Sequence, residues 1–437
     1  MVTAFDIFLS APVLVKVLGS LAFILVLNRF CRQLVVSLGA GALLLAVWTG
    51  HPPAAIARIS WQRFSSVNNI CLMIIVFQVI WLSCQMSETG VMRDLVAAVR
   101  ARIKHRTALA ALPAIIGMLP MPGGAIFSAP LVDDCDHDKS IPPLLKTEIN
   151  YWFRHVWEYW WPLYPGVLLA IEIADLPIWQ FMVVQFPLSV LSVVAGWFLL
   201  LRRVETPGED GDGMWSGGRR FSIPKLLAPV LAVIGVYTAI RVAFPATMDV
   251  SRYLPMILGL IVGIGTLQIQ RPLKLETWRA MLLSRKTFTL AVVVAVVRIY
   301  GAFIEGHLPG GDILLVEQMG RELALWHVPV VAIIMLLPFV SGLASGLAVG
   351  FVGASFPIVF SLIGTDPSPG LVLATLILAY GFGYMGMILS PVHVCLVVTN
   401  EHFKTRVVNS IREMVPPACV VLAGVLLYYG ILHLILI

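Results

Sequence analysis

Residues 107–132 read TALAALPAIIGMLPMPGGAIFSAPLV, an apolar segment interrupted by prolines and glycines. Proline removes a helical hydrogen bond and clashes with the preceding turn, so one continuous helix is unfavourable here. Two half-helices that meet at a tip fit better. Residues 107–119 would rise about 20 Å and residues 125–132 about 12 Å, which is enough to enter a membrane and return. The stretch therefore predicts a re-entrant hairpin.

A second copy of this pattern follows in the other half of the chain. Six identical residues recur at one constant spacing of 229 positions, as in 353 − 124 and 380 − 151: Gly124, Ala125, Phe127, Tyr151, Phe153 and Pro162 match Gly353, Ala354, Phe356, Tyr380, Phe382 and Pro391. Paired interrupted segments in two halves of a membrane protein point to a transporter's substrate site.

The composition indicates a membrane protein. Of the 437 residues, 59% are hydrophobic and only 12% are charged, against roughly 25% charged in a soluble domain. The net charge of +6 is attributed to basic residues in cytoplasmic loops and is not taken as a sign of nucleic-acid binding. The six cysteines form no CxxC motif, so we expect no disulfide framework, no metal site and no cofactor. The first apolar stretch has no basic n-region or small-residue cleavage site before it, which favours a retained span over a signal peptide.

The apolar runs predict an all-α fold with about ten spans and two hairpins. A spanning helix needs about 20 mostly apolar residues, and ten runs meet or approach this length: 7–28, 34–50, 66–86, 144–170, 178–201, 223–244, 252–268, 287–306, 369–398 and 415–437. Two further segments, 107–132 and 328–363, are interrupted and are predicted to be hairpins.

The domain organisation follows from these spans. Residues 1–201 and 223–437 each contain five crossings and one hairpin, and the polar stretch 202–222 is the cytoplasmic linker. Five is an odd number, so the second half enters from the opposite side and the repeats are inverted. With both termini outside the cell, the cytoplasmic loops hold most of the 30 basic residues, as short cytoplasmic loops do.

The hairpin tips are candidate binding elements, because irregular backbone at membrane depth needs protein or a water-filled cavity to satisfy it. The first tip exposes backbone amides at the start of a half-helix, which favours an anion. The second adds hydroxyl groups. The alternative is that small residues merely permit close helix packing. The predicted substrate-binding residues at the two tips are Pro122, Gly123, Gly124, Ser341, Gly342, Ser345 and Gly346.

Both hairpins are followed by a predicted broken span, 144–170 and 369–398. In the second, Gly381, Gly383 and Gly386 precede Ser390 and a proline, and these residues are expected to unwind the helix at mid-membrane. In the first, bulky aromatic residues replace the glycines, so the site should be asymmetric.

Ionisable residues in the broken spans are the candidates for chemistry. Arg154 and Glu158 are spaced i, i+4 and can pair on one helix face, either to lower the cost of burying charge or with Arg154 as the ligand of a substrate carboxylate. His155, Glu158 and His393 are the candidate proton-coupling residues; His393 could equally be a satisfied core histidine. Arg298 needs a partner from another helix or the substrate. The run Asp133–Asp138 could hold a divalent cation but fits a solvated loop better.

The chain resembles the ion transporter superfamily, in which two inverted repeats of five spans each carry a hairpin and a broken helix. The segments Leu119-Pro-Met-Pro-Gly-Gly124, Asn150-Tyr-Trp-Phe-Arg-His155 and Trp161-Pro162 are similar to those of a member family, the domain of unknown function 401. This resemblance implies a homodimer with a fixed scaffold and an elevator-like transport domain. The Ser-Asn-Thr tips of the sodium-coupled dicarboxylate carriers are absent, which puts sodium coupling in doubt.

The leading hypothesis is a proton-coupled secondary transporter of a small organic anion in the cell inner membrane, and not an enzyme. A cation/proton antiporter that uses Glu158 is the first alternative. An intramembrane hydrolase that uses Ser355 and His393 is the second, although the sequence provides no oxyanion donor or third group for it.

Overall fold

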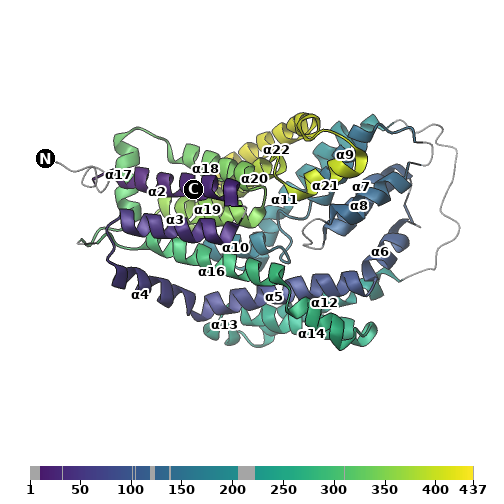
Figure 1. The fold of residues 1–437 in the computed structure, drawn as a ribbon, viewed down its shortest axis with the longest axis horizontal. Coiled ribbons are helices and arrows are strands. Elements are labelled where there is room, and N and C mark those ends of the chain that lie inside the picture. Colours follow the sequence, from purple (N-terminus) through teal and green to yellow (C-terminus); the bar gives the residue numbers. More distant parts are fainter. Residues whose placement is uncertain are drawn as a thin grey trace.

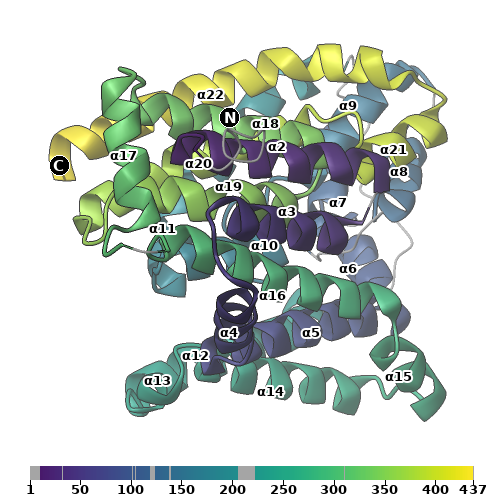
Figure 2. The same cartoon turned by 60° about the vertical axis from the view of Figure 1, so that its left-hand side comes forward.

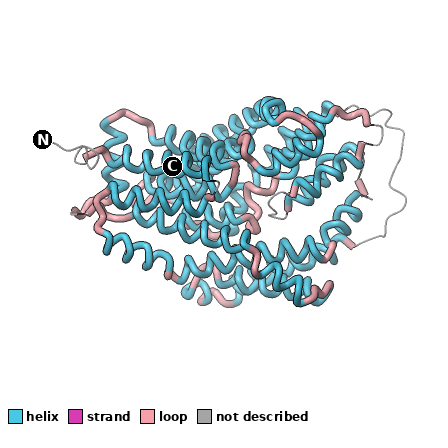
Figure 3. The backbone as a smooth tube through the Cα atoms, in the orientation of Figure 1, coloured by secondary structure: helices cyan, strands magenta, loops and turns pink. Residues whose placement is uncertain are grey.

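The protein is described here from a computed structural model, which covers residues 10–31, 33–100, 102–103, 105–118, 124–136, 139–204, 222–309 and 311–436. Over these ranges the chain is almost entirely helical and has no strand (Figure 3). The predicted all-α membrane class is confirmed. In the first half the helices are α2 (Val13–Cys31), α3 (Leu34–Trp48), α4 (Pro53–Phe64), α5 (Val67–Glu88), α6 (Val91–Arg100), α7 (His105–Gly117), α8 (Ala125–Asp134), α9 (Pro143–Arg154), α10 (Pro165–Ile173), α11 (Ile178–Leu199) and the 3-10 turn η1 (Leu201–Arg203).

The second half follows the same order of elements. Its helices are α12 (Ile223–Ala243), α13 (Thr247–Val250), α14 (Leu254–Gln270), α15 (Leu275–Leu282), α16 (Arg285–Glu305), α17 (Leu315–Leu325), α18 (Val330–Ser345), α19 (Ala348–Leu362), α20 (Pro369–Ile388), α21 (Val394–Phe403) and α22 (Val407–Leu436). Each half begins with two apolar helices, which are followed by a short helix, a long helix and a second short helix. A helix pair, a broken span and a long helix then complete the half. The inverted relation of the halves and their exact boundaries stay predictions.

Fewer helices are long enough to span a membrane than the ten runs predicted. In the described part of the chain, seven helices pass by length and composition: α2, α5, α11, α12, α16, α20 and α22. The count is eight if α17 and α18, which are bent by 112° relative to each other, form one span. Helices α3 and α14 have 15 and 17 residues, short of the roughly 20 that a 30 Å core requires. The run 144–170 is divided between α9 and α10.

Both predicted hairpins are helix pairs. In the first, α7 continues through Pro113 to Gly117, and α8 begins at Ala125; of the predicted tip 120–125, residues 120–123 lie outside the described residues. In the second, α18 runs to Ser345, and Gly346 ends it in the left-handed region with φ of 61°. The predicted tip at Ser341–Gly346 is therefore placed too early, because Ser341, Gly342 and Ser345 are helical.

The two broken spans break at different places. Helix α9 ends at Arg154 and turns follow, as the first pattern predicted. Helix α20 continues through Gly381, Gly383 and Gly386 to Ile388, so the prediction that these glycines unwind it is wrong. A membrane interior offers no water to replace a lost backbone hydrogen bond, so a glycine-rich helix stays helical unless a proline or a neighbour intervenes. The chain leaves the helix only just before Pro391.

The glycines of α20 instead allow other helices to approach closely. A methyl group added at Gly386 would collide with the carbonyl oxygen of Phe339 on α18, and one added at Gly342 with the carbonyl oxygen of Gly383. Backbone therefore lies directly against backbone where α18 crosses α20. The alternative considered for the hairpin glycines, close packing, describes Gly342 correctly.

The halves interlock around the hairpins and breaks (Figures 1 and 2). Helix α10 of the first half packs on α19 of the second, and α21 of the second packs on α8 and α9 of the first. Helix α14 contacts both α5 and α12, and the three lie together at the bottom of Figure 1, apart from the layer of α18, α20 and α22. Each broken span thus lies against the hairpin of the opposite half.

Candidate functional site

Two tyrosines of α20 donate hydrogen bonds to the irregular backbone that follows α9. The hydroxyl of Tyr384 donates a hydrogen bond to the carbonyl oxygen of His155 at 2.5 Å, and the hydroxyl of Tyr380 donates to that of Glu158 at 2.7 Å. A helix that ends inside a membrane leaves carbonyl groups without helical partners, and these need other donors. The second half of the chain therefore stabilises the irregular backbone of the first.

Two histidines from different breaks meet in the interior. His155 follows α9 and His393 precedes α21, and their Nε2 atoms lie 3.1 Å apart. The Sγ atom of Cys395 completes a group whose three ligand atoms all lie within 4.8 Å of one another. His155, His393 and Cys395 are 1%, 5% and 7% exposed, so the cluster is buried in the protein interior. The sequence predicted both histidines as site residues but not that they touch.

Arg154 lies at the end of α9 beside this cluster, and its side chain points at the start of α8. A methyl group added at Gly124 would collide with the Arg154 guanidinium group, so the missing side chain of Gly124 makes room for this charge. Arg154 is 2% exposed. Arg154 and Glu158 do not share one helix face, as the i, i+4 spacing predicted, because the helix ends at Arg154. Glu158 instead lies 3.9 Å from His155, between Oε1 and Nε2.

The second hairpin reaches the cluster through Gly346. A methyl group at this position would lie 2.9 Å from the backbone nitrogen of His393 and 3.1 Å from the hydroxyl oxygen of Ser390. That hydroxyl donates to the carbonyl oxygen of Leu343 at 2.7 Å. Gly346 and Ser390 therefore fix the break that carries His393.

The other predicted binding residues fall into three groups. Pro122 and Gly123 lie outside the described residues. Gly342, Gly381 and Gly383 lie against neighbouring helices, as Gly381 does against Val425 of α22, whereas buried Ser341 donates to the carbonyl oxygen of Leu337 within its own helix α18. Ser345 and Gly386 are also helical. The structure thus brings together Gly124, Arg154, His155, Glu158, Gly346, Ser390 and His393 and leaves the remaining described residues in helix packing.

The sequence interpretation missed Cys395, because it took the absence of a CxxC motif to mean that no cysteine belongs to a site. A usable signal was present, since Cys395 follows His393 by two residues, directly after a proline-induced break. It also missed Glu172, because a single acidic residue late in an apolar run gives no pattern.

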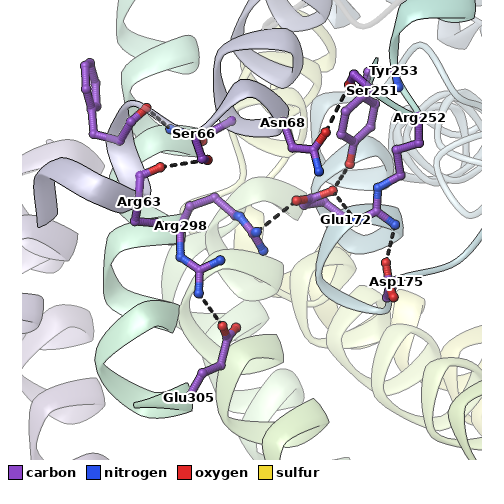
Figure 4. Close-up of polar contacts among 12 residues, drawn as sticks. Arg63, Ser66, Asn68, Glu172, Asp175, Ser251, Arg252, Tyr253, Arg298 and Glu305 are labelled. Carbon is purple, nitrogen blue, oxygen red and sulfur yellow. Dashed lines mark hydrogen bonds and ion pairs between the residues drawn. The ribbon is translucent and has the colours of Figure 1, made fainter. Parts of the chain in front are cut away.

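Glu172 is the partner that Arg298 was expected to need (Figure 4). Its Oε1 lies 2.9 Å from Nη2 of Arg298, and its Oε2 lies 2.9 Å from Nη2 of Arg252 and accepts a hydrogen bond from the Tyr253 hydroxyl. The Glu172 side chain is 1% exposed. The partner is therefore another helix, α10, and not a substrate. These ion pairs and the hydrogen bond link α10 to α16 and to residues 252–253, directly before α14.

The acidic run 133–138 is partly solvated, as predicted: Asp133 and Asp134, at the end of α8, are exposed, Asp136 is buried, and Asp138 lies outside the described residues. Asp136 is 5% exposed, and its carboxylate pairs with Lys146 at 3.0 Å. Lys146 also donates to Asp133 at 2.7 Å, and this hydrogen bond lowers the pKa of Asp133 below its usual value. Asp136 accepts hydrogen bonds from the backbone of Ser140 and Ile141. The loop is therefore tied to the start of α9 rather than freely solvated.

The resemblance suggested by the hairpin and aromatic motifs is confirmed by the family comparison. The sequence model described as "Protein of unknown function (DUF401)" matches residues 14–432. This chain belongs to the DUF401 family. No curated protein is significantly similar to this DUF401 member in sequence.

Several solved chains resemble this DUF401 fold, and one of them does so over most of its length. It is the YdaH transporter of Alcanivorax borkumensis, whose crystal structure is described as revealing an unusual topology. The match has a TM-score of 0.57 and 13% identity, and it covers 85% of this chain and 86% of that one. At this identity the likeness shows a shared fold.

Proposed function

We propose that this DUF401 member is a secondary active transporter of a small organic anion, coupled to protons, that works by elevator-like alternating access. The observation that carries the proposal is the buried group of Arg154, His155 and His393, which lies where two helix breaks meet two hairpins. Ionisable groups at membrane depth are costly and mark substrate or proton pathways by default. The fold shared with a transporter supports the same class.

The anion is inferred from two positive features that converge. Arg154 brings a full positive charge to the interior, and a carboxylate can bind a guanidinium group through two parallel hydrogen bonds. Helix α8 begins at Ala125, next to that guanidinium group. Its first backbone N–H groups and its dipole favour negative charge. A carboxylate between Arg154 and α8 would satisfy both.

The coupling proton is proposed to bind to the pair His155 and His393, with Glu158 beside them. Histidine changes charge near neutral pH, which suits a proton carrier. The Nε2 atoms at 3.1 Å can share a proton, and the carboxylate of Glu158 at 3.9 Å from His155 can stabilise a charged imidazole. Substrate and proton would therefore bind in adjacent positions.

The burial of the cluster supports alternating access, because a solute can reach it only if the surrounding helices move. The proposal includes a homodimer in the cell inner membrane with both termini outside, as the resemblance and the basic loops predict. The transport domain would contain the hairpins α7–α8 and α18–α19 and the broken spans. The scaffold would contain α5, α12 and α14.

The test is thermal stabilisation of the detergent-purified protein by mono-, di- and tricarboxylates, sugar acids, oxyanions and sodium. A ligand that binds only the folded state raises stability by RT ln(1 + [L]/Kd), about 2.7 kcal/mol at 100-fold over Kd. We expect a shift from one anion class that is lost in Arg154→Ala and in Gly124→Ala, which displaces the guanidinium group. Arg279→Ala, an exposed arginine of α15, is the matched control and should keep the shift. An anion shift that persists in Arg154→Ala contradicts the proposal.

The contact between His155 and Glu158 favours a cation/proton antiporter as the second candidate. In that case a cation would displace a proton from Glu158. Addition of sodium to proteoliposomes would release protons, and Glu158→Gln would abolish the release. A thermal shift from sodium alone, without any anion response, would support this candidate over the first.

The hydrolase alternative has less support. The Ser355 hydroxyl is buried within α19 and donates to the carbonyl oxygen of Phe351 at 2.7 Å. A nucleophilic serine needs a base within hydrogen-bond reach, and among the described residues Ser355 contacts a backbone carbonyl instead. Labelling of Ser355 by a fluorophosphonate would be needed to restore this candidate.

A further inference from the structure

The cluster of His155, His393 and Cys395 has the composition and spacing of a metal site. The sequence predicted no metal, since these residues come from places 238 positions apart in the chain. In a tetrahedral zinc site with bonds of about 2.0–2.3 Å, neighbouring ligand atoms lie roughly 3.3–3.6 Å apart. Here the two Nε2 atoms are 3.1 Å apart and all three ligand atoms are within 4.8 Å. Binding requires the longest separation to shorten by about 1.2 Å and the two Nε2 atoms to move apart by about 0.2 Å.

We propose that His155, His393 and Cys395 bind one transition-metal ion of the Zn²⁺ and Co²⁺ class. Imidazole and thiolate are ligands for these borderline and soft ions, whereas Mg²⁺ and Ca²⁺ prefer oxygen. The inference uses the same cluster as the proposed transporter but does not require that an anion is carried. It concerns the ligand set alone.

The surroundings of His155 are those of a metal ligand. Its Nδ1 lies 2.5 Å from the carbonyl oxygen of Tyr151. A carbonyl can only accept, so Nδ1 carries the proton and the Nε2 lone pair faces His393. Metal-binding histidines are oriented in this way by an acceptor on the other ring nitrogen. The backbone of α9 therefore presets both the ring orientation and the tautomer of the first ligand.

The second histidine strengthens the argument. Two imidazole lone pairs that face each other at 3.1 Å repel, so a proton or a cation must lie between the Nε2 atoms of His155 and His393. An ion there would replace the shared proton, because histidine ligands bind metals as neutral rings. Cys395 then supplies the third ligand as a thiolate.

A neighbouring charge fits an ion with an open fourth position. Oε1 of Glu158, 3.9 Å from His155 Nε2, can approach as a fourth ligand or counter-charge. Three protein ligands and one exchangeable position is the arrangement of metal sites that also bind a small molecule.

The experiment is a Co²⁺ titration of the chelator-treated, detergent-purified full chain, followed by absorption. We expect saturation at one equivalent, with a near-ultraviolet thiolate-to-cobalt charge-transfer band and intense visible bands of tetrahedral cobalt. Zn²⁺ should remove both, and Mg²⁺ should not. Cys395→Ser should lose the charge-transfer band. His393→Gln should weaken cobalt binding by more than about tenfold.

Cys135→Ser is the matched control, because Cys135 is also buried, at 2% exposed, but does not belong to the cluster. It should leave the spectrum unchanged. A wild-type protein without the charge-transfer band overturns the proposal, as does a band that survives Cys395→Ser. If Cys395→Ser does not elute as folded protein, His393→Gln decides: unchanged cobalt affinity overturns the site. Anion stabilisation is measured separately, so failure of the metal site leaves the transporter proposal standing, and the reverse.

Discussion

Tyr384 of α20 and His155, which follows α9, lie 229 residues apart in the chain, and they touch. The Tyr384 hydroxyl donates to the His155 carbonyl oxygen at 2.5 Å. If the halves are related by a pseudo-twofold axis, residues at equivalent positions can meet only near that axis. In the predicted repeat, positions 155 and 384 are equivalent, so the contact would then place the break after α9, and the histidine that follows it, near that axis.

The first prediction concerns this hydrogen bond. Tyr384→Phe keeps the ring and leaves the buried His155 carbonyl without its donor, so we expect a loss of about 1–3 kcal/mol in unfolding free energy. Thermal unfolding of the purified protein measures the loss. Tyr429→Phe, in a half-buried position of α22, is the control and should unfold at the wild-type temperature. Equal stability of both variants would mean that the break does not depend on α20.

The second prediction is that His155 and His393 act as a pair. In a double-mutant cycle of His155→Ala and His393→Ala, the effects should depart from additivity by about 0.5–3 kcal/mol, as for residues in direct contact. The measurement is the unfolding midpoint of the two single variants and the double variant. Additive effects would show that the two rings do not interact in the folded protein.

The third prediction compares a buried ion cluster with an exposed ion pair. Glu172→Gln removes the charge shared by Arg298 and Arg252 and takes the ion-pair partner from buried Arg298, while Arg252 keeps Asp175; this should cost about 3–5 kcal/mol. Glu305→Gln breaks only the partly exposed pair with Arg63 and should cost about 1 kcal/mol or less. Thermal unfolding of both variants tests this difference. A similar small loss in each would mean that Glu172 is solvated.

The fourth prediction concerns the glycines of α20. Gly386→Ala places a methyl group against the backbone carbonyl of Phe339, which cannot rotate away. We expect a loss of about 1–3 kcal/mol through overpacking. Gly235→Ala on α12 has no neighbouring atom within 4 Å and should instead gain up to about 1 kcal/mol from helix propensity. If Gly386→Ala were also stabilising, α18 and α20 could not be in backbone contact.

Much of the fold could be predicted from local sequence. The prolines and glycines around residues 113–130 predict the first helix pair, since proline acts on its own turn. The run from Tyr151 to Pro162 predicts a break, and α9 ends at Arg154 within it. The candidate ligands Arg154, His155 and His393 were predictable as costly residues in apolar segments.

Other features of the fold could not be predicted from local sequence. The second break was expected at Gly383 but lies after Ile388, because whether a glycine-rich segment unwinds depends on the helices that pack against it. Ser341 and Gly342 were expected at a tip but belong to α18, for the same reason.

The sequence by itself determined the membrane class, the order of helices, the two helix pairs and the presence of buried charge. These properties depend on hydrophobicity and on backbone restrictions within a few residues. Only the tertiary structure decided that His155 meets His393, that Cys395 joins them, and that Glu172 neutralises Arg298. Each of these contacts joins distant segments whose approach is set by the packing of whole helices, so no local pattern encodes it.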